Sequence, residues 1–139
     1  MFRSLVLALA LIPTALGAAL PPCASDKFMR QATDVVQVKV TDVQIPSEVG
    51  AANSFVKCPV QGVVRRVFRG ALAQGQTVKF GVLCWTDAVG PGWITDPAAL
   101  KSVRVLEVHM IDGQPVGKGP SVLILDTVSD AIVWRPECG

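Results

Sequence analysis

The sequence contains no tyrosine and only one histidine, His109. It also lacks four motifs that mark common enzyme classes: G-x-S-x-G, H-E-x-x-H, the P-loop and the glycine fingerprint of dinucleotide-binding domains. A histidine-based triad would therefore depend entirely on His109, which has one close carboxylate, Glu107, on the same strand face. Two such groups do not make a catalytic or metal site, so we expect a solvated pair on the outside of a sheet. We predict no enzyme activity, no cofactor and no metal.

Long apolar runs are missing beyond the first residues, and a membrane span needs about 20 apolar residues. Residues 1–19 combine Arg3, a largely apolar run and small residues at the end, which is the pattern of a secretory signal peptide. We predict cleavage after Ala19, with cleavage after Gly17 as the alternative. What remains is a soluble single domain of residues 20–139, secreted or periplasmic.

A strong net charge is also missing. Arg3 leaves with the signal peptide, so 12 of the 13 basic residues remain against 11 acidic ones. A net charge so close to zero gives no electrostatic reason for binding to nucleic acid or to an acidic membrane surface. Arg65, Arg66 and Arg69 cluster on one predicted strand and could form an anion surface. Because alternation sends Arg65 and Arg66 to opposite faces of that strand, we favour a solvated or edge-protecting role.

Closely spaced cysteines are absent as well, since no two of the four form the C-x-x-C pair of a zinc site. Their even number in an exported chain predicts two disulfides. The hairpin described below places Cys58 beside Cys84 on neighbouring strands, which predicts the first bridge. The second, between Cys23 and Cys138, follows partly by elimination and partly because nearby prolines keep both chain ends out of regular strands. It would tie the two ends of the mature chain together.

Alternating apolar and polar residues predict five long β-strands and one short one. Turns or short helices separate the strands, and no long crossover helix is present, which excludes a doubly wound α/β fold. The strands are predicted at 34–43, 60–69, 76–85, 103–111, 121–127 and 131–134, and the helices at 25–32 and 97–101. We predict a mostly β protein, a small OB-like antiparallel β-barrel of five or six strands with one or two short helices.

The best-defined unit is the hairpin of strands 60–69 and 76–85, whose connection has a glycine at each end. With the turn centred near Leu72, the predicted neighbours are Val64 and Val78, Gly62 and Phe80, Val60 and Val82, and Cys58 and Cys84. In this register the Phe80 ring would cover the backbone that Gly62 leaves bare.

Three segments resemble the netrin-like domains, the barrel family that includes the tissue inhibitors of metalloproteinases: Thr33–Val40, Val63–Gly70 and Gly75–Phe80. In that family an N-terminal cysteine and a helix precede a strand with a "DVVxxxxV" phrase, and a "VxxVFKG"-like phrase and a "GxxV" strand follow. The resemblance implies a secreted barrel that binds protein partners. The inhibitors begin with C-x-C, and their first cysteine meets the zinc of the target enzyme. Here Cys23-Ala24-Ser25 lacks the second cysteine, so the resemblance implies the fold and not the inhibition.

Trp85 and Trp93 flank the loop 86–92 and could stack on a ligand or a partner, although tryptophans that fold back to close a barrel are equally common. We expect a monomeric binding module for a protein or small-molecule ligand, with no nucleic acid and no membrane span. Its predicted partner-binding residues are Trp85, Asp87, Trp93, Cys23, Ala24 and Ser25. The alternatives are an inhibitor of a secreted hydrolase, which would use residues 20–25, and a small hydrolase built around His109.

Overall fold

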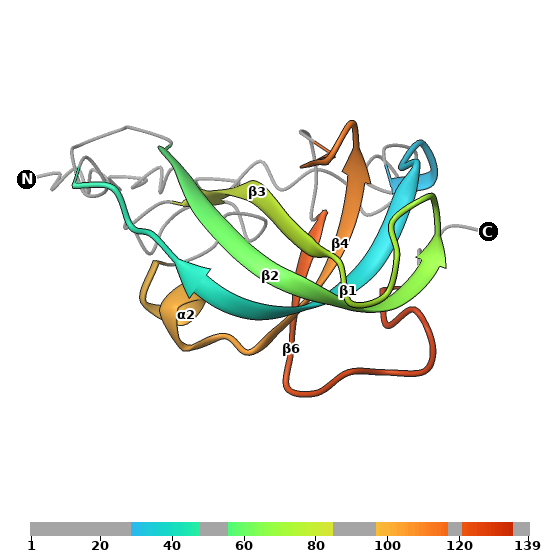
Figure 1. The fold of residues 1–139 in the computed structure, drawn as a ribbon. Helices are drawn as coiled ribbons and strands as arrows, with labels where there is room; N and C mark the ends of the chain where they lie inside the picture. Colours follow the sequence, from blue (N-terminus) through green and yellow to red (C-terminus); the bar gives the residue numbers. More distant parts are fainter. Residues whose placement is uncertain (1–28, 48–55, 85–96, 117–120, 135–139) are drawn as a thin grey trace, which may run out of the picture.

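The computed structural model describes residues 29–47, 56–84, 97–116 and 121–134. These residues form a sheet of six antiparallel strands, nearly closed into a barrel, with one short helix (Figure 1). The elements are β1 (Asp34–Val43), β2 (Val56–Arg69), β3 (Thr77–Cys84), α2 (Pro97–Ser102), β4 (Val105–Ile111), β5 (Gln114–Pro115) and β6 (Val122–Leu125). The predicted fold class is confirmed. No helix in these ranges is long and apolar enough to cross a membrane.

Strand β1 lies at the centre of the sheet, between β2 and β4. The other side of β2 pairs with β3, and the other side of β4 is shared by β5 and β6. The backbone N–H of Gly81 in β3 donates a hydrogen bond to Oε1 of Gln114 in β5, over 3.0 Å. This bond joins strands from opposite ends of the sheet order, so it helps to close the barrel.

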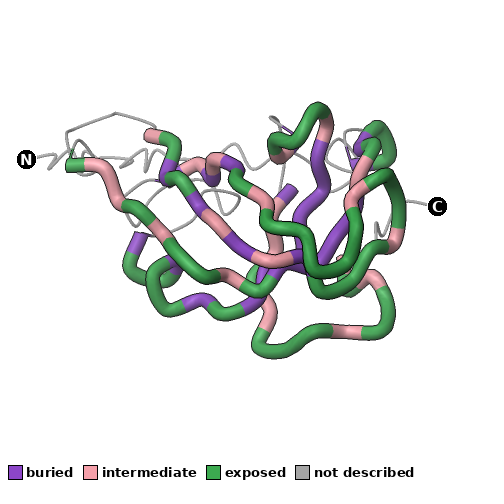
Figure 2. Tube along the Cα trace, viewed as in Figure 1, coloured by how far each residue is buried: buried purple, intermediate pink, exposed green. Residues whose placement is uncertain are grey.

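Buried and less buried residues alternate along much of β2 and β3, as the period of two requires (Figure 2). The buried side chains of these strands belong to the main hydrophobic core. Helix α2 begins at Pro97, a favoured first helical position, and buries Leu100 completely in the same core. The buried members of this core are Val36, Val38, Cys58, Val60, Val64, Phe80, Val82, Cys84, Leu100, Val103, Leu106, Val108 and Met110.

Strand β2 pairs with β1 in an antiparallel ladder, and the register between the two strands shifts at three places. Such bulges increase the twist of a strand pair and let a sheet curl into a barrel. Gly62 lies opposite Val40 of β1, close to the backbone of Lys39. A Cβ atom on Gly62 would lie 2.6 Å from the carbonyl oxygen of Lys39 and would also strike Val38. Only glycine fits at position 62 without a shift of the neighbouring backbone.

The observed register of the β2–β3 hairpin differs from the predicted one by two residues. Val60 lies opposite Phe80, and Gly62 lies opposite Val78. The observed pairs centre on residue 70, one position before the centre of the predicted pairs. Backbone hydrogen bonds between Val64 and residues 75 and 76 close the hairpin in this register. The predicted cover of Gly62 by Phe80 is therefore wrong.

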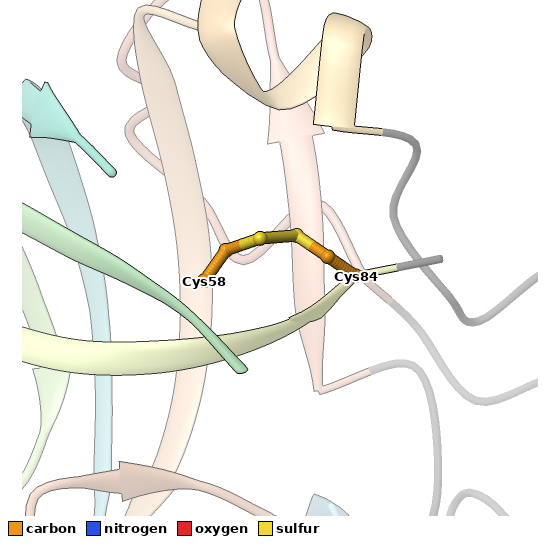
Figure 3. The surroundings of a disulfide bond; sticks show 2 residues. All are labelled: Cys58 and Cys84. Atoms are coloured by element: carbon orange, nitrogen blue, oxygen red, sulfur yellow. A yellow bond between two sulfur atoms is a disulfide. The ribbon is translucent and has the colours of Figure 1, made fainter. Parts of the chain in front are cut away.

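The predicted disulfide between Cys58 and Cys84 is present, with the two Cα atoms 5.9 Å apart (Figure 3). A shift of two residues keeps every side chain on its own face, so both cysteines still point into the core. Cys84 now lies diagonal to Cys58, because Cys58 faces Val82 directly. The other predicted bridge, between Cys23 and Cys138, lies outside the described residues and stays a prediction.

Other differences from the predicted elements are small. Strand β2 begins at Val56, and β4 begins at Val105. Residues 131–134 do not form the predicted short strand, because their backbone is held by side chains of other strands. Of the predicted N-terminal helix, Met29 and Arg30 are helical, and residues 25–28 lie outside the described ranges.

The close approach of β1 to Gly62 of β2 can be tested with Gly62→Ala. The added methyl group meets backbone that cannot move freely, so we expect a loss of about 2–3 kcal/mol in urea unfolding, as in overpacked cores. Gly81→Ala is the matched control in the same hairpin. Its Cβ would meet only the flexible side chain of Lys57, at 3.2 Å, so the cost should stay below about 1 kcal/mol. Equal losses of stability in the two variants would contradict the close approach of β1 to Gly62.

The Cys58–Cys84 bridge should stabilise the barrel by restricting the unfolded chain. Its sequence separation is 26 residues, for which the chain-entropy model gives about 3 kcal/mol. We expect the double variant Cys58→Ala/Cys84→Ala to unfold at a correspondingly lower urea concentration while keeping its far-ultraviolet circular dichroism. A midpoint equal to that of the oxidised protein would show that the bridge does not stabilise the fold.

Candidate functional site

Three polar side chains are buried on the outer face of β1 and β4: Gln37, Glu107 and His109. Their exposed fractions are 0%, 0% and 3%. We call them the outer-face polar cluster. The prediction of a solvated Glu107–His109 pair is therefore wrong. The physical reason is that residues 129–134, the C-terminal strap, lie over this face and hydrogen-bond to it.

The strap is held through its backbone. Oε1 of Gln37 accepts a hydrogen bond from the Ser129 N–H over 2.6 Å, and Nε2 of Gln37 donates to Oε2 of Glu107 over 3.0 Å. The Glu107 carboxylate then accepts two successive backbone N–H groups, from Val133 over 2.9 Å and from Trp134 over 3.1 Å. Two side chains thus take the place of a pairing strand, and the strap needs no β-ladder of its own.

His109 completes the cluster. Its Nε2 lies 3.4 Å from Oε1 of Glu107, and its ring meets Trp134 edge to face, with centroids 5.7 Å apart and planes at 71°. Its Nδ1 is buried and has no hydrogen-bond partner among the described residues. The His109 ring therefore contributes packing against Trp134 as well as its contact with Glu107.

The Glu107 carboxyl has a lowered pKa. Burial, the largest single influence, raises the pKa because it disfavours the charged form. Hydrogen bonds from His109, Val133, Gln37 and Trp134 together outweigh burial and hold the pKa below its ordinary value of 4.5. Glu107 is therefore a carboxylate at neutral pH. Both of its oxygens are occupied and no solvent reaches it, so the cluster fastens the strap and offers no open position to a substrate.

A second feature is open to solvent. A groove of about 380 Å³ crosses the outer face of β2 and β3, a size within the range of ligand sites. We call it the polar groove. Its lining residues are Asp42, Gln44, Pro59, Val60, Gln61, Lys79, Phe80, Gly81 and Gln114.

The strand register explains the shape of the groove. Pro59 lies directly opposite Gly81, and neither carries a long side chain, so the surface is low at this pair. The neighbouring row runs across three strands, from Asp42 through Gln61 to Lys79. It offers a carboxylate, an amide and an ammonium group in sequence. Such a row can accept and donate hydrogen bonds to one polar ligand at once.

Searches of protein-family models, curated proteins and solved structures found no match to this chain. The resemblance to the netrin-like domains stays a prediction.

The predicted partner-binding residues stay predictions. Trp85, Asp87, Trp93, Cys23, Ala24 and Ser25 all lie outside the described residues. Sequence reasoning missed the groove because the predicted hairpin register was two residues out and set Gly81 opposite Gln61. The usable signal was the run of polar or small residues at the outward positions of both hairpin strands.

The arginines of β2 differ from the prediction in one respect. A bulge falls at Arg65, because Gln37 pairs with Arg66 while Val38 pairs with Val64. Alternation therefore fails here, and Arg65 and Arg66 are both exposed. Arg66 forms an ion pair with Asp130 of the strap.

Arg69, the last arginine of β2, donates to the backbone carbonyl of Arg30 over 3.1 Å. In the ranges described above, no group of three or more histidine, cysteine, aspartate or glutamate side chains could hold a metal ion.

Glu107→Gln tests the strap attachment. The amide would present N–H groups to several donors, so we expect the variant to lose about 2 kcal/mol of stability at pH 7. Because the folded pKa of Glu107 lies below its unfolded value, its contribution is complete above about pH 4.5 and is lost as the pH falls through the folded pKa. The variant should lack this acid-sensitive component.

Urea unfolding between about pH 7 and pH 3 measures both effects. Asp126→Asn is the control, since Asp126 is an exposed carboxylate and should change stability by less than about 0.5 kcal/mol. An acid-induced loss of the same size in Glu107→Gln and in the wild type would rule out Glu107 as its source.

Proposed function

We infer that this chain is an exported β-barrel binding protein whose ligand lies in the polar groove. The groove itself carries this inference. In the groove, open volume coincides with several donors and acceptors on neighbouring strands. Asp42, Gln61 and Lys79 form one row, and Gln44 and Gln114 flank the adjacent row of Pro59 and Gly81.

The alternative of a hydrolase built around His109 is less well supported than binding. A general acid or base must reach its substrate, and His109 is only 3% exposed and lies under the strap. The hydrolase built around His109 would require the strap to leave the Glu107 carboxylate first.

The groove is built on paired strands. Its walls come from β1, β2, β3 and β5, and the Cys58–Cys84 bridge lies directly beside Pro59 on the inner face. Groups held on paired strands lose little freedom when a ligand binds, which favours affinity.

Export is proposed on two observations. Residues 1–19 have the pattern of a signal peptide. The barrel also contains a disulfide, and such bonds persist mainly in oxidising compartments. We expect residues 20–139 to act as a monomeric domain, with the loop around Trp85 and Trp93 as a further partner surface.

The proposal is tested by filling the groove. Gln61→Trp places a large ring among the lining residues, and tryptophan is compatible with a strand. Thr77→Trp is the matched control, because Thr77 is exposed on β3 two residues from Lys79 and does not line the groove. Purified protein would be screened against arrays of defined oligosaccharides and peptides. We expect every genuine ligand to lose at least about tenfold in affinity with Gln61→Trp and little with Thr77→Trp. Ligands that bind both variants equally well would place the binding surface elsewhere.

A further inference from the structure

Positive charge gathers on the outer face of β1, β2 and β3, although the chain as a whole is nearly neutral. Lys39, Lys57 and Lys79 come from the three strands in turn, and all three are exposed. Among the described residues the acidic side chain on this face is Asp42. The other described acidic residues lie at turns, near the strap or under it: Asp34, Glu107, Asp112, Asp126 and Asp130. Among the described residues, this face thus carries three lysines and one aspartate.

The three lysines border the polar groove. Lys79 is one of its lining residues and lies opposite Gln61. The side chain of Lys57 passes over Gly81, where an added Cβ would lie 3.2 Å from its Cδ. Lys39 lies opposite Val63, one row beyond Gln61. At about 3.4 Å per residue, the rows from Val63 to Lys57 span roughly 20 Å along β2, so the charges follow an elongated path.

We propose that the polar groove and its three lysines bind an acidic polysaccharide. This deepens the proposed function and rests on it. The lysines can pair with carboxylate or sulfate groups distributed along a chain. Asp42, Gln44 and Gln61 lie between them and can bond to sugar hydroxyls, which both donate and accept hydrogen bonds. Nε2 of Gln44 donates to the Asp42 carboxylate over 3.4 Å, and the remaining lone pairs of this carboxylate can accept from hydroxyl groups of such a ligand.

Two other polyanions fit this face less well. Protein interfaces centre on aromatic or apolar anchors and are depleted in lysine. The large hydrophobic side chains exposed in the described ranges are Val67, Ile124, Val128 and Val133, and none of them lines the groove. Single-stranded nucleic acid is held by bases stacked on aromatic rings. The aromatic residue among the described residues of the groove, Phe80, is only 3% exposed and cannot serve as a platform.

The test uses fluorescein-labelled polygalacturonate oligomers, with neutral dextran of matched length as the uncharged probe. Anisotropy titrations would compare the wild type with Lys57→Gln/Lys79→Gln. Arg66→Gln/Arg69→Gln removes the same amount of charge from the far end of β2 and serves as the control. We expect dextran to bind at least about tenfold more weakly than polygalacturonate. The lysine variant should lose about tenfold, and the arginine variant less than about twofold. Raising the salt to about 0.3 M should weaken wild-type binding, since exposed charges are screened.

Other results would overturn the proposal. Equal binding of dextran, equal losses in the two charge variants, or no effect of salt would exclude an acidic polysaccharide. Tighter binding of polyglutamate or of oligothymidylate through the same lysines would assign the face to an acidic protein or to nucleic acid. Failure of this proposal can be separated from failure of the proposed function. If a neutral ligand loses affinity for Gln61→Trp but not for the lysine variant, groove binding stands and the acidic polysaccharide is excluded. If ligands bind both variants as tightly as the wild type, both proposals are contradicted.

Discussion

The central strand β1 constrains the rest of the structure, because its outer face changes role halfway along. Its first half carries Val35 and Gln37, which are buried and must be covered. Its second half carries Lys39 and Asp42, which are exposed. Strand β4 is buried on both faces beside the first half. The C-terminal strap supplies the cover there and leaves the second half of β1 free. The buried network and the open groove are thus two consequences of one strand with two environments.

The covered half shows how a charged group is kept in a protein interior. Glu107 loses its contact with water and regains four hydrogen bonds, two of them from successive backbone N–H groups of the strap. A buried charge is tolerated only when it is paired in this way. The carboxylate therefore fixes where the strap lies. His109 contributes mainly packing, since one of its ring nitrogens has no partner within the part of the chain that the structure describes.

Local sequence patterns predicted much of the fold, but they did not predict the outer-face polar cluster or the polar groove. The predicted bounds of β1, 34–43, agree with the structure, and so do the β2–β3 hairpin, helix α2 and the Cys58–Cys84 bridge. Alternation decides these features over a few residues. The burial of Glu107 depends on Val133 and Trp134, which lie 26 and 27 residues away, and no local pattern reports it. The groove depends on the pairing of Pro59 with Gly81, in a register closed by the backbone bonds between Val64 and residues 75 and 76. Alternation along the strands does not distinguish registers that differ by two residues.

We propose that the two halves of the outer face have different roles. The half under the strap is structural, and the half with the polar groove binds the ligand. A titration of ¹⁵N-labelled protein with polygalacturonate oligomers, followed through backbone amide shifts, tests this division most directly. We expect the largest changes at Gln61, Lys79 and Gly81, with residues 129–134 unchanged. Changes concentrated on the strap, with the amides of the groove unmoved, would contradict it.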